Sequence, residues 1–371
     1  MVVVGSSIAG TATTVSLLSS RPEADVTLID RHLHKRTSRC AGGISLHMLS
    51  KTGLTLPRRL VQTEIRSVQV YGPDLETHWG FTSSTAYGYV VDRPRLEEWL
   101  TAGAEKLGAR VVEWNVPSLC ALVRRYPSNY VVGADGLNST VRKYLGLPAP
   151  KPQDIHLCVQ YEAEWPVHPP GEIRLYLSSK LAPGGYAWIF PAGDGRVKVG
   201  LGVPVHVTGK SQLLERFRGA VDAPPVTSLV GKMIPTASPM KTCVYGNTAL
   251  VGDAALHCDP ATGGGIANAL IAGNLLGQAL AEHGVYSKGI EEPRIVEPLE
   301  LYDVWWKQAV GQRNQLRYRV KQLIQRLGDE GVTRLLNSLQ SFTPRSSDVG
   351  RELVRAVLHV LLRDPKLLLK P

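Results

Sequence analysis

Cysteine is scarce in this chain of 371 residues, and its few copies are scattered. The five cysteines are Cys40, Cys120, Cys158, Cys243 and Cys258, an odd number with no CxxC pair among them. Zinc sites and the disulfide frameworks of secreted proteins need closely spaced or evenly paired cysteines. We therefore expect no metal site and no disulfide framework, and a cytoplasmic location is the default.

Long apolar runs are also missing. No uninterrupted apolar stretch reaches the roughly 18 residues that a membrane-spanning helix needs. The first residues, MVVVGSSIAG, carry no basic leader before the apolar run, so they predict a strand and not a signal peptide. Only one residue precedes the valines, so either the strand begins at the first residue or a few residues are missing from the start.

Positive charge is in excess, and it is unevenly placed. The net charge is +10, and the segment from Trp305 to the end carries 13 Lys or Arg residues against 5 Asp or Glu residues. Such a segment attracts phosphate groups on nucleic acid, anionic lipid or a soluble substrate. No nucleic-acid motif accompanies it, so we expect no nucleic-acid partner. Ordinary solvated helix faces remain an alternative explanation.

The residues after Pro298 have helical spacing. One apolar set comprises Leu316, Val320, Leu323, Ile324 and Leu327, and a second comprises Leu353, Val354, Val357, Leu358, Leu361 and Leu362. The second set is surrounded by Arg351, Arg355, Arg363, Lys366 and Lys370. This pattern is typical of an interfacial amphipathic helix. A basic-rimmed lid packed on another domain would show the same pattern.

The N-terminal segment has the pattern of a dinucleotide-binding loop. A strand at Val2–Val4 is followed by GSSIAG, a helix, and a second strand that ends in Asp30. In this pattern Gly5 permits the tight turn, Gly10 permits close packing of helix on strand, and Asp30 binds a ribose hydroxyl. Ser7 replaces the middle glycine, which weakens the match at the pyrophosphate.

The stretch from Ala249 to Ala279 contains a second ligand-binding pattern. A short apolar strand breaks at Gly252-Asp253, turns at Asp259-Pro260, and enters Gly263-Gly264-Gly265 before an Ala/Leu/Ile-rich helix. Glycine costs roughly 1 kcal/mol relative to alanine inside a helix, so three in a row favour a close backbone approach to a ligand. The N-terminus of the following helix offers backbone N–H groups and a positive dipole end to an anion.

Three shorter segments carry further candidate residues. Gly42-Gly43 follows Cys40 and indicates another backbone approach to a ligand, while Cys40 itself is either a small buried residue or a functional thiol near Arg36 and Arg39. Residues 63–91 alternate as strands do, and a helix then begins with Arg93, which could reach a phosphate. Asp135-Gly136 lies at the carboxyl end of a strand, where α/β folds bind ligands.

An aromatic strand dominates the segment 151–245, which otherwise reads as hairpins and prolines. In PGGYAWIFP, from Pro183 to Pro191, period-2 alternation places Tyr186, Trp188 and Phe190 on one face. The pattern alone favours a core face over an apolar substrate wall.

Three motifs occur in one order: GSSIAG with Asp30, then VVGADGLNSTVR, then ALVGDAAL with GGGI. This order resembles the FAD-dependent oxidoreductases built like p-hydroxybenzoate hydroxylase, over residues 1–280. The resemblance implies that Gly5, Ser7 and Gly10 belong to a loop that holds the FAD pyrophosphate, that Asp30 holds the adenosine ribose, and that the Gly-Asp segment contacts ribityl and pyrophosphate.

Two further motifs narrow the resemblance. Cys40-Ala-Gly-Gly43 is similar to the Cys-x-Gly-Gly loop of the geranylgeranyl reductase family, and Pro183–Pro191 is similar to the PxxYxWxFP motif that lines its prenyl channel. This resemblance implies that Tyr186 and Trp188 line an apolar tunnel, against the preference from the pattern alone. The FAD contacts that it implies are Ala9, Asp30, Cys40, Ala41, Gly43, Arg93, Asp253, Gly265 and Ile266.

The resemblance implies a flavoenzyme that saturates isolated C=C bonds of a polyprenyl chain, on archaeal-type ether lipids or a related compound. Cys40 is the candidate assisting residue, and the electrons would come from NAD(P)H or reduced ferredoxin. The basic C-terminal helices would seat the enzyme on the anionic inner face of a membrane. Open alternatives are an FAD-dependent monooxygenase, a non-redox flavin cyclase or isomerase, and a membrane-binding protein with structural FAD.

The sequence predicts an α/β protein with a Rossmann-like FAD-binding domain, an antiparallel-sheet substrate domain and C-terminal helices. The FAD-binding domain would comprise residues 1–62, 92–150 and 246–290. The substrate domain would comprise strands in 63–91 and the segment 151–245, and a helical region would follow at 291–371.

Overall fold

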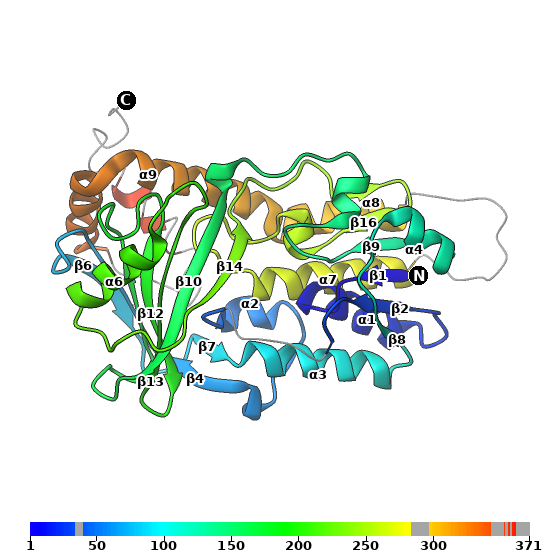
Figure 1. The fold of residues 1–371 in the computed structure, drawn as a ribbon, viewed down its shortest axis with the longest axis horizontal. Coiled ribbons are helices and arrows are strands. Elements are labelled where there is room, and N and C mark those ends of the chain that lie inside the picture. Colours follow the sequence, from blue (N-terminus) through cyan, green and yellow to red (C-terminus); the bar gives the residue numbers. More distant parts are fainter. Residues whose placement is uncertain (34–39, 283–296, 343–351, 353–354, 357, 361–371) are drawn as a thin grey trace. The chain divides into compact units, whose positions relative to one another are not determined.

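The computed structural model describes residues 1–33, 40–282, 297–342, 352, 355–356 and 358–360, and Figure 1 shows its ribbon. The chain divides into two compact units. The first comprises Met1–Thr37, Arg93–Pro150 and Pro235–Leu316, and the second comprises Ser38–Asp92, Lys151–Ile234 and Arg317–Pro371. The domain boundaries drawn from the sequence stay a prediction. Arg36 and Arg39 lie outside the described residues, as do Leu353, Val354, Val357, Leu361 and Leu362 of the predicted basic helix.

The first unit is built on a six-stranded sheet. Its strand order is β15 (Val244–Tyr245), β16 (Thr248–Leu250), β9 (Val131–Gly133), β1 (Val2–Val4), β2 (Thr27–Asp30) and β8 (Arg110–Glu113). All neighbours pair in parallel except β15 with β16. The central strand β1 is buried along its whole length, as a parallel strand covered on both faces requires.

Helices and turns complete the first unit. They are α1 (Ile8–Ser20), α3 (Arg93–Lys106), α4 (Leu119–Arg125), α5 (Thr140–Tyr144), the 3-10 turn η3 (Gly252–Ala255), α7 (Ile266–Glu282), α8 (Glu297–Trp306) and the π-helical turn η4 (Lys307–Gly311). Most of α7 is buried, which agrees with its Ala/Leu/Ile-rich sequence.

Helices α1 and α7 pack unusually closely, because glycine stands at the contact. A Cβ added at Gly273 would lie 2.5 Å from the Ala9 carbonyl oxygen, and one added at Gly277 would lie 2.5 Å from the Ser16 Cβ. Ala9 therefore faces Gly273 and Ser16 faces Gly277, so the two helices run in the same direction. Their N-termini consequently point toward the same end of the unit.

The second unit contains two sheets. The larger has the order β14 (Val230–Pro235), β10 (Ile155–Glu164), β13 (Arg196–Pro204), β12 (Tyr186–Gly193), β11 (Glu172–Tyr176), β5 (Ser67–Tyr71) and β6 (His78–Thr82). Three neighbouring pairs are antiparallel, namely β10 with β13, β13 with β12, and β12 with β11, whereas β11 pairs with β5 in parallel. The smaller sheet has the order β3 (Gly43–Ser45), β7 (Gly88–Val91) and β4 (Val61–Ile65).

Short helices and one long helix accompany these sheets. The short ones are α2 (Leu46–Ser50), η1 (Arg58–Leu60), η2 (Pro152–Asp154) and α6 (Lys210–Ala220). The long helix α9 (Gln312–Leu339) crosses the boundary between the units and is kinked at Gly328, which has φ 61°. The predicted α/β class, with one parallel sheet, one mostly antiparallel sheet and a C-terminal helical region, is confirmed.

One face of the larger sheet forms the core of the second unit. Val199, Leu201 and Ile189 pack there with Leu214 and Phe217 of α6. Helix α9 is tied to the same unit by a buried ion pair, in which Lys321 Nζ lies 3.0 Å from Asp154 Oδ1. Since side chains alternate along a strand, the neighbouring residues of β12 and β13 lie on the opposite face.

The α1–α7 contact yields a prediction for matched glycine substitutions. Gly273→Ala should destabilise the first unit by about 1–3 kcal/mol, because its Cβ would overlap backbone and Ala12 at 2.7 Å or less. Gly103→Ala, in α3, should stabilise it by about 0.5–1 kcal/mol, since its Cβ would meet only Val15 at 4.0 Å. Thermal and urea unfolding measure both. Equal effects of the two substitutions would contradict the close helix contact.

Candidate functional site

The loop between β1 and α1 is held by close backbone packing. Gly5 has φ 108°, and a Cβ there would lie 2.2 Å from the Ala134 carbonyl oxygen. A Cβ at Gly10 would lie 1.9 Å from the Gly5 carbonyl oxygen. Both glycines are therefore required by the turn itself. The turn leaves the N-terminus of α1 open to an anionic group.

Asp30 closes this loop from the end of β2. Its Oδ2 accepts hydrogen bonds from the Ser6 backbone N–H at 2.7 Å and from the Ser6 hydroxyl at 2.8 Å. Its Oδ1 accepts from the His32 backbone N–H at 2.9 Å. The carboxylate is thus oriented beside the glycine loop, where the sequence pattern places a ribose-binding acid.

Ser7 and Arg93 are joined in one charged network. The Ser7 hydroxyl donates to Glu97 Oε1 at 2.5 Å and accepts from Arg93 Nη2 at 3.0 Å. Arg93 Nε also contacts Glu97 Oε1 at 2.8 Å, and both side chains are mostly shielded from solvent. The serine that replaces the middle glycine of the motif is therefore bonded to the predicted cofactor arginine. Glu97 was not among the sequence candidates, although it stands four residues after Arg93 in a helix.

The Gly252–Asp253 turn is shaped by a buried histidine. His257 Nδ1 accepts a hydrogen bond from the Gly252 backbone N–H at 3.2 Å, and its Nε2 lies 3.3 Å from Cys243 Sγ. The ring stacks on Trp306 with a centroid separation of 3.7 Å. Burial lowers the pKa of His257 to about 3, so the ring is neutral at neutral pH. A Cβ at Gly252 would lie 2.8 Å from the Ala9 Cβ, so this turn abuts the start of α1.

The glycine run before α7 is organised by Asp259. Its Oδ1 accepts from the backbone N–H groups of Ala261 at 3.0 Å and Thr262 at 3.3 Å. Its own backbone N–H donates to the Gly264 carbonyl at 3.0 Å. A Cβ at Gly265 would be 3.8 Å from Asp253 Oδ1, so the predicted residues Asp253, Gly265 and Ile266 lie together at the start of α7.

The first unit therefore fits a phosphate-bearing dinucleotide. Two helices present their N-termini at one end, and β2 ends in an acidic residue. Asp135 Oδ1 is buried and, among the described residues, has no hydrogen-bond partner. Burial raises the pKa of Asp135, against hydrogen bonds from Ser139 and the Thr140 backbone that favour the charged form. An orphaned carboxylate oxygen beside Gly5 is consistent with a bound polar ligand.

The Cys40–Gly43 loop belongs to the second unit. The Gly42 N–H approaches Cys40 Sγ at 3.4 Å, and the Gly42 carbonyl accepts from the Val91 N–H at 2.9 Å. Gly42 has φ 88°, and a Cβ there would lie 2.4 Å from the Val91 carbonyl oxygen. A Cβ at Gly43 would lie 2.8 Å from Phe190 Cε1. The loop is thus fitted against β7 on one side and the aromatic strand on the other.

The predicted aromatic face lies on the side of the sheet opposite α6. Tyr186, Trp188 and Phe190 pair across the strands with Gly202, Gly200 and Lys198 of β13. A Cβ at Gly200 would lie 2.6 Å from Trp188 Cζ2, so the indole lies over a strip of glycine backbone. Tyr186 and Trp188 meet at a tilted angle with centroids 5.8 Å apart.

The same face carries unpaired polar atoms. Trp188 Nε1 and Gln160 Oε1 are buried and have no hydrogen-bond partner within the described part of the chain. Both residues are 6% exposed, and both flank the Gly200 position. The sequence pattern alone favoured a core face here, and Phe190 does pack against a core cluster that includes Ile65 and Val90. The assignment of Tyr186 and Trp188 to a substrate wall stays a prediction.

The predicted residues thus fall into two sets, and each set is brought together within its own unit. The first unit holds Gly5, Ser7, Ala9, Gly10, Asp30, Arg93, Asp253, Gly265 and Ile266. The second unit holds Cys40, Ala41, Gly43, Tyr186 and Trp188. Lys198 was missed, although a charged residue alternating with Gly200 and Gly202 in an apolar strand is a detectable signal.

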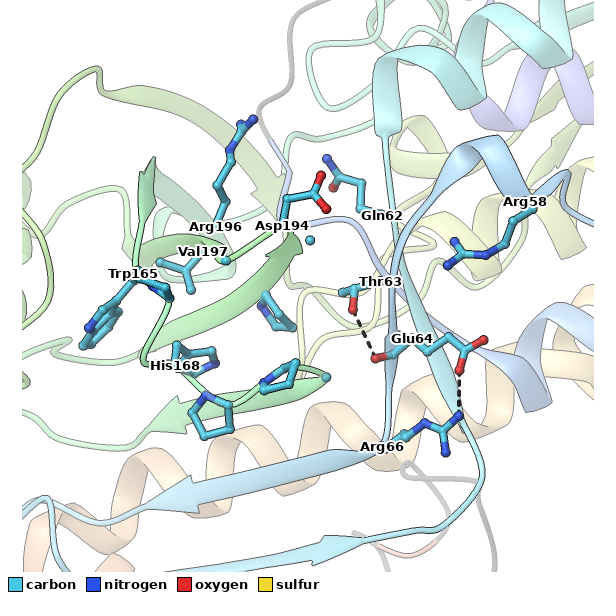
Figure 2. A pocket seen from close by; sticks show the side chains of 17 residues that line it. Arg58, Gln62, Thr63, Glu64, Arg66, Trp165, His168, Asp194, Arg196 and Val197 are labelled. Atoms are coloured by element: carbon cyan, nitrogen blue, oxygen red, sulfur yellow. Dashed lines mark hydrogen bonds and ion pairs between the residues drawn. The ribbon is translucent and has the colours of Figure 1, made fainter.

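A separate pocket lies in the second unit (Figure 2). Its basic residues are already engaged: Arg66 pairs with Glu64 at 2.9 Å, Arg196 pairs with Glu162, and Arg58 donates to the Val61 carbonyl at 2.8 Å. None of the predicted cofactor or substrate residues lines this pocket.

His257 makes the stability of the first unit sensitive to acid. An unfolded histidine binds a proton below about pH 6.5, whereas the buried ring stays neutral down to a pKa of about 3. The free energy of unfolding should therefore fall by up to about 1.4 kcal/mol per pH unit as the pH drops from 6.5 toward 3. His257→Asn should flatten this slope in melting curves at pH 7, 6 and 5. An unchanged slope would show that His257 is not the titrating group.

Comparison with known proteins places these features in context. Residues 154–224 match the family described as geranylgeranyl reductase catalytic domain. A digeranylgeranylglycerophospholipid reductase of Methanothrix thermoacetophila is 32% identical over 359 residues, covering 89% of this chain and 88% of the relative.

Solved structures show the same fold. A geranylgeranyl bacteriochlorophyll reductase-like protein from Thermoplasma acidophilum superposes with a TM-score of 0.82 at 23% identity, covering 99% of this chain and 98% of that one. Klebsiella pneumoniae HpxO, crystallised with FAD, superposes with a TM-score of 0.66 at 14% identity, covering 96% and 98%. The fold is that of FAD-dependent flavoenzymes. No helix among the described residues is both long and apolar enough to cross a membrane.

Proposed function

The chain belongs to the geranylgeranyl reductase family, and from this premise we propose that it saturates C=C bonds of the geranylgeranyl chains of digeranylgeranylglycerophospholipid or its precursors. The family membership makes it an oxidoreductase of geranylgeranyl reductase type. The structural observation that supports the substrate proposal is the aromatic face of β12, which lies on the side of the sheet opposite α6 and carries the buried, unpaired Trp188 Nε1.

The proposed cofactor is FAD, held by residues of both sets. The loop of Gly5, Ser7 and Gly10 and the start of α7 would bind the pyrophosphate through backbone N–H groups. Asp30 would hold the adenosine ribose. The remaining proposed contacts are Ala9, Cys40, Ala41, Gly43, Arg93, Asp253, Gly265 and Ile266. When bound, reduced FAD supplies the hydride, and the protein supplies binding and orientation.

Tyr186 and Trp188 would form the wall for the prenyl chain. An isolated alkene is not activated, so the protein must hold it aligned in a dry apolar environment. The tilted pair of rings offers large, rigid apolar surface for this purpose. Cys40 is the proposed assisting residue beside the cofactor.

Partners and location follow from charge and substrate. The proposed electron donor is NAD(P)H or reduced ferredoxin. The 13 Lys or Arg residues after position 305 support a cytoplasmic protein that associates peripherally with the anionic inner face of a membrane.

The role of Asp30 is tested by replacing its carboxylate with the uncharged amide of asparagine. Asp30→Asn should weaken FAD binding tenfold or more, because it removes a charged acceptor whose hydrogen bonds are worth about 1.5–3 kcal/mol. Asp25→Asn is the matched control, since Asp25 precedes the same strand and its exposed carboxylate pairs with Arg110 at 3.2 Å. Titration with flavin fluorescence measures both. If Asp30→Asn binds FAD as the unsubstituted protein does, Asp30 does not hold the ribose.

The reaction is tested anaerobically with the dithionite-reduced, FAD-loaded protein and a lipid carrying two geranylgeranyl chains. Mass spectrometry should show product masses that rise in steps of two hydrogens. An unchanged lipid beside reduced flavin would refute the proposal for this substrate. An oxygen-dependent gain of one oxygen atom would instead indicate a monooxygenase, and a rearranged product of unchanged mass would indicate a cyclase or isomerase.

The substrate wall is tested with paired tryptophan substitutions. Trp188→Leu should lower turnover at least tenfold while flavin content is retained, because Trp188 faces the proposed prenyl site. Trp165→Leu should leave turnover nearly unchanged, since Trp165 lines the separate pocket of Figure 2. Equal losses from both substitutions would place the substrate elsewhere.

A further inference from the structure

Ser7 stands at the N-cap of α1, but its side chain does not cap the helix. Its backbone is extended, with φ −76° and ψ −172°, and its carbonyl oxygen accepts a helical hydrogen bond from the Thr11 N–H at 3.1 Å. A serine in this position usually accepts a hydrogen bond at its hydroxyl from the N–H of the second or third helical residue. These residues are Ala9 and Gly10, and the Ser7 hydroxyl bonds to neither.

The Ser7 hydroxyl is instead turned to α3. It donates its one proton to Glu97 Oε1 at 2.5 Å, and it accepts from Arg93 Nη2 at 3.0 Å. Arg93 Nε donates to the same Glu97 oxygen at 2.8 Å, so each of the three side chains contacts the other two. The Arg93 and Glu97 side chains are only 16% and 13% exposed, so these contacts are partly removed from competing water.

The two orientations of this hydroxyl have opposite consequences for an anion at α1. The first N–H groups of a helix have no partner within the helix, and they are the groups that a phosphate binds. A serine cap would occupy the N–H of Ala9 or Gly10, and a phosphate would have to displace it. The dinucleotide-binding pattern has glycine at this position, which has no hydroxyl to compete. In this chain the contacts with Glu97 and Arg93 keep the hydroxyl of Ser7 away.

We propose that Glu97 is a positioning residue that, together with Arg93, holds the Ser7 hydroxyl away from α1, so that the N–H groups of Ala9 and Gly10 stay available to the FAD pyrophosphate. The inference rests on the proposed cofactor and deepens it. It accounts for a serine where the binding pattern has glycine, and it gives Glu97 a role that acts through Ser7.

The first test follows amide hydrogen exchange of Ala9 and Gly10 by NMR in the FAD-free, full-length protein. Glu97→Ala removes the acceptor of the Ser7 hydroxyl, which should then cap α1. Exchange at one of the two amides should slow by about two- to thirtyfold, which corresponds to the free energy of a serine cap. Glu97→Gln retains the acceptor oxygen and should leave both exchange rates unchanged.

Glu98→Ala is the matched control for this test. It removes an exposed carboxylate from the next position of the same helix. Both amides should exchange in this variant as they do in the unsubstituted protein. If Glu97→Ala does not fold, Glu97→Leu replaces it, because leucine also lacks the acceptor and fills more of the space that the glutamate occupies.

The second test measures FAD affinity by flavin fluorescence, with and without the Ser7 hydroxyl. In the Glu97→Ala protein, adding Ser7→Ala should tighten FAD binding by about two- to thirtyfold, because the competing hydroxyl is removed. In the unsubstituted and Glu97→Gln proteins, Ser7→Ala should give no such gain, since the hydroxyl is already turned away from α1. Each comparison is made at a fixed residue 97, so any direct effect of that residue on Arg93 is common to both members of the pair.

Two results would overturn the proposal. One is amide exchange at Ala9 and Gly10 that is unchanged in folded Glu97→Ala, or that slows equally in Glu98→Ala. The other is Ser7→Ala that fails to tighten FAD binding in the Glu97→Ala protein. A loss of affinity on adding Ser7→Ala there would show that the serine binds the cofactor and does not compete with it.

The exchange test needs no cofactor and no lipid, so the two proposals fail separately. Amides that respond to Glu97 in a protein that does not bind FAD would refute only the proposed cofactor. FAD binding and lipid reduction by a protein whose amides do not respond to Glu97 would refute only the role of Glu97.

Discussion

Helices α1 and α7 touch through glycines, and the positions of both helix N-termini follow from this contact. Because Gly273 and Gly277 have no side chain, the backbones approach each other as closely as two helices can. The parallel direction of the helices adds their dipoles at one end instead of cancelling them. The turns at Gly5 and Gly252 then bring loops to that end. A single packing constraint thus creates the electrostatic environment of the proposed cofactor site.

The buried polar groups of the first unit support this geometry. His257 is kept neutral by burial and uses its Nδ1 to hold the Gly252 N–H, while Asp259 collects the backbone N–H groups of the turn before α7. Both residues act on the backbone of these turns, and this effect does not require contact with a ligand. His257 satisfies the Gly252 backbone donor, which would otherwise be buried without a partner at a cost of about 1–3 kcal/mol.

The two faces of the larger sheet in the second unit carry different side chains. Val199 and Leu201 form the core with α6, whereas Trp188 and Phe190 lie on the other face with the Cys40 loop. The Trp188 ring lies over Gly200 and Gly202, because these two residues of β13 have no side chain that would contact the ring. The buried charge of Lys198 on the same face is explained by its contact with the loop.

Local patterns in the sequence determined much of this protein. The valine strand, the glycine spacing of the first loop, Asp30 and the alternation of Tyr186 with Trp188 predicted the fold class, because these features act over a few residues. The pattern at 183–191 could predict a shared face but not which face of the sheet is the core. Which face packs against α6 depends on a helix that comes later in the chain.

Only the tertiary structure decided the contacts between distant segments. The bonds from Lys198 to Ala41, from Ser7 to Glu97 and from His257 to Gly252 join a side chain to a partner whose identity no local period encodes. They arise because the fold brings together segments that lie apart in the chain. Sequence alone therefore predicted which residues would bind a dinucleotide and a prenyl chain, and the fold determined which hydrogen bonds hold those residues in place.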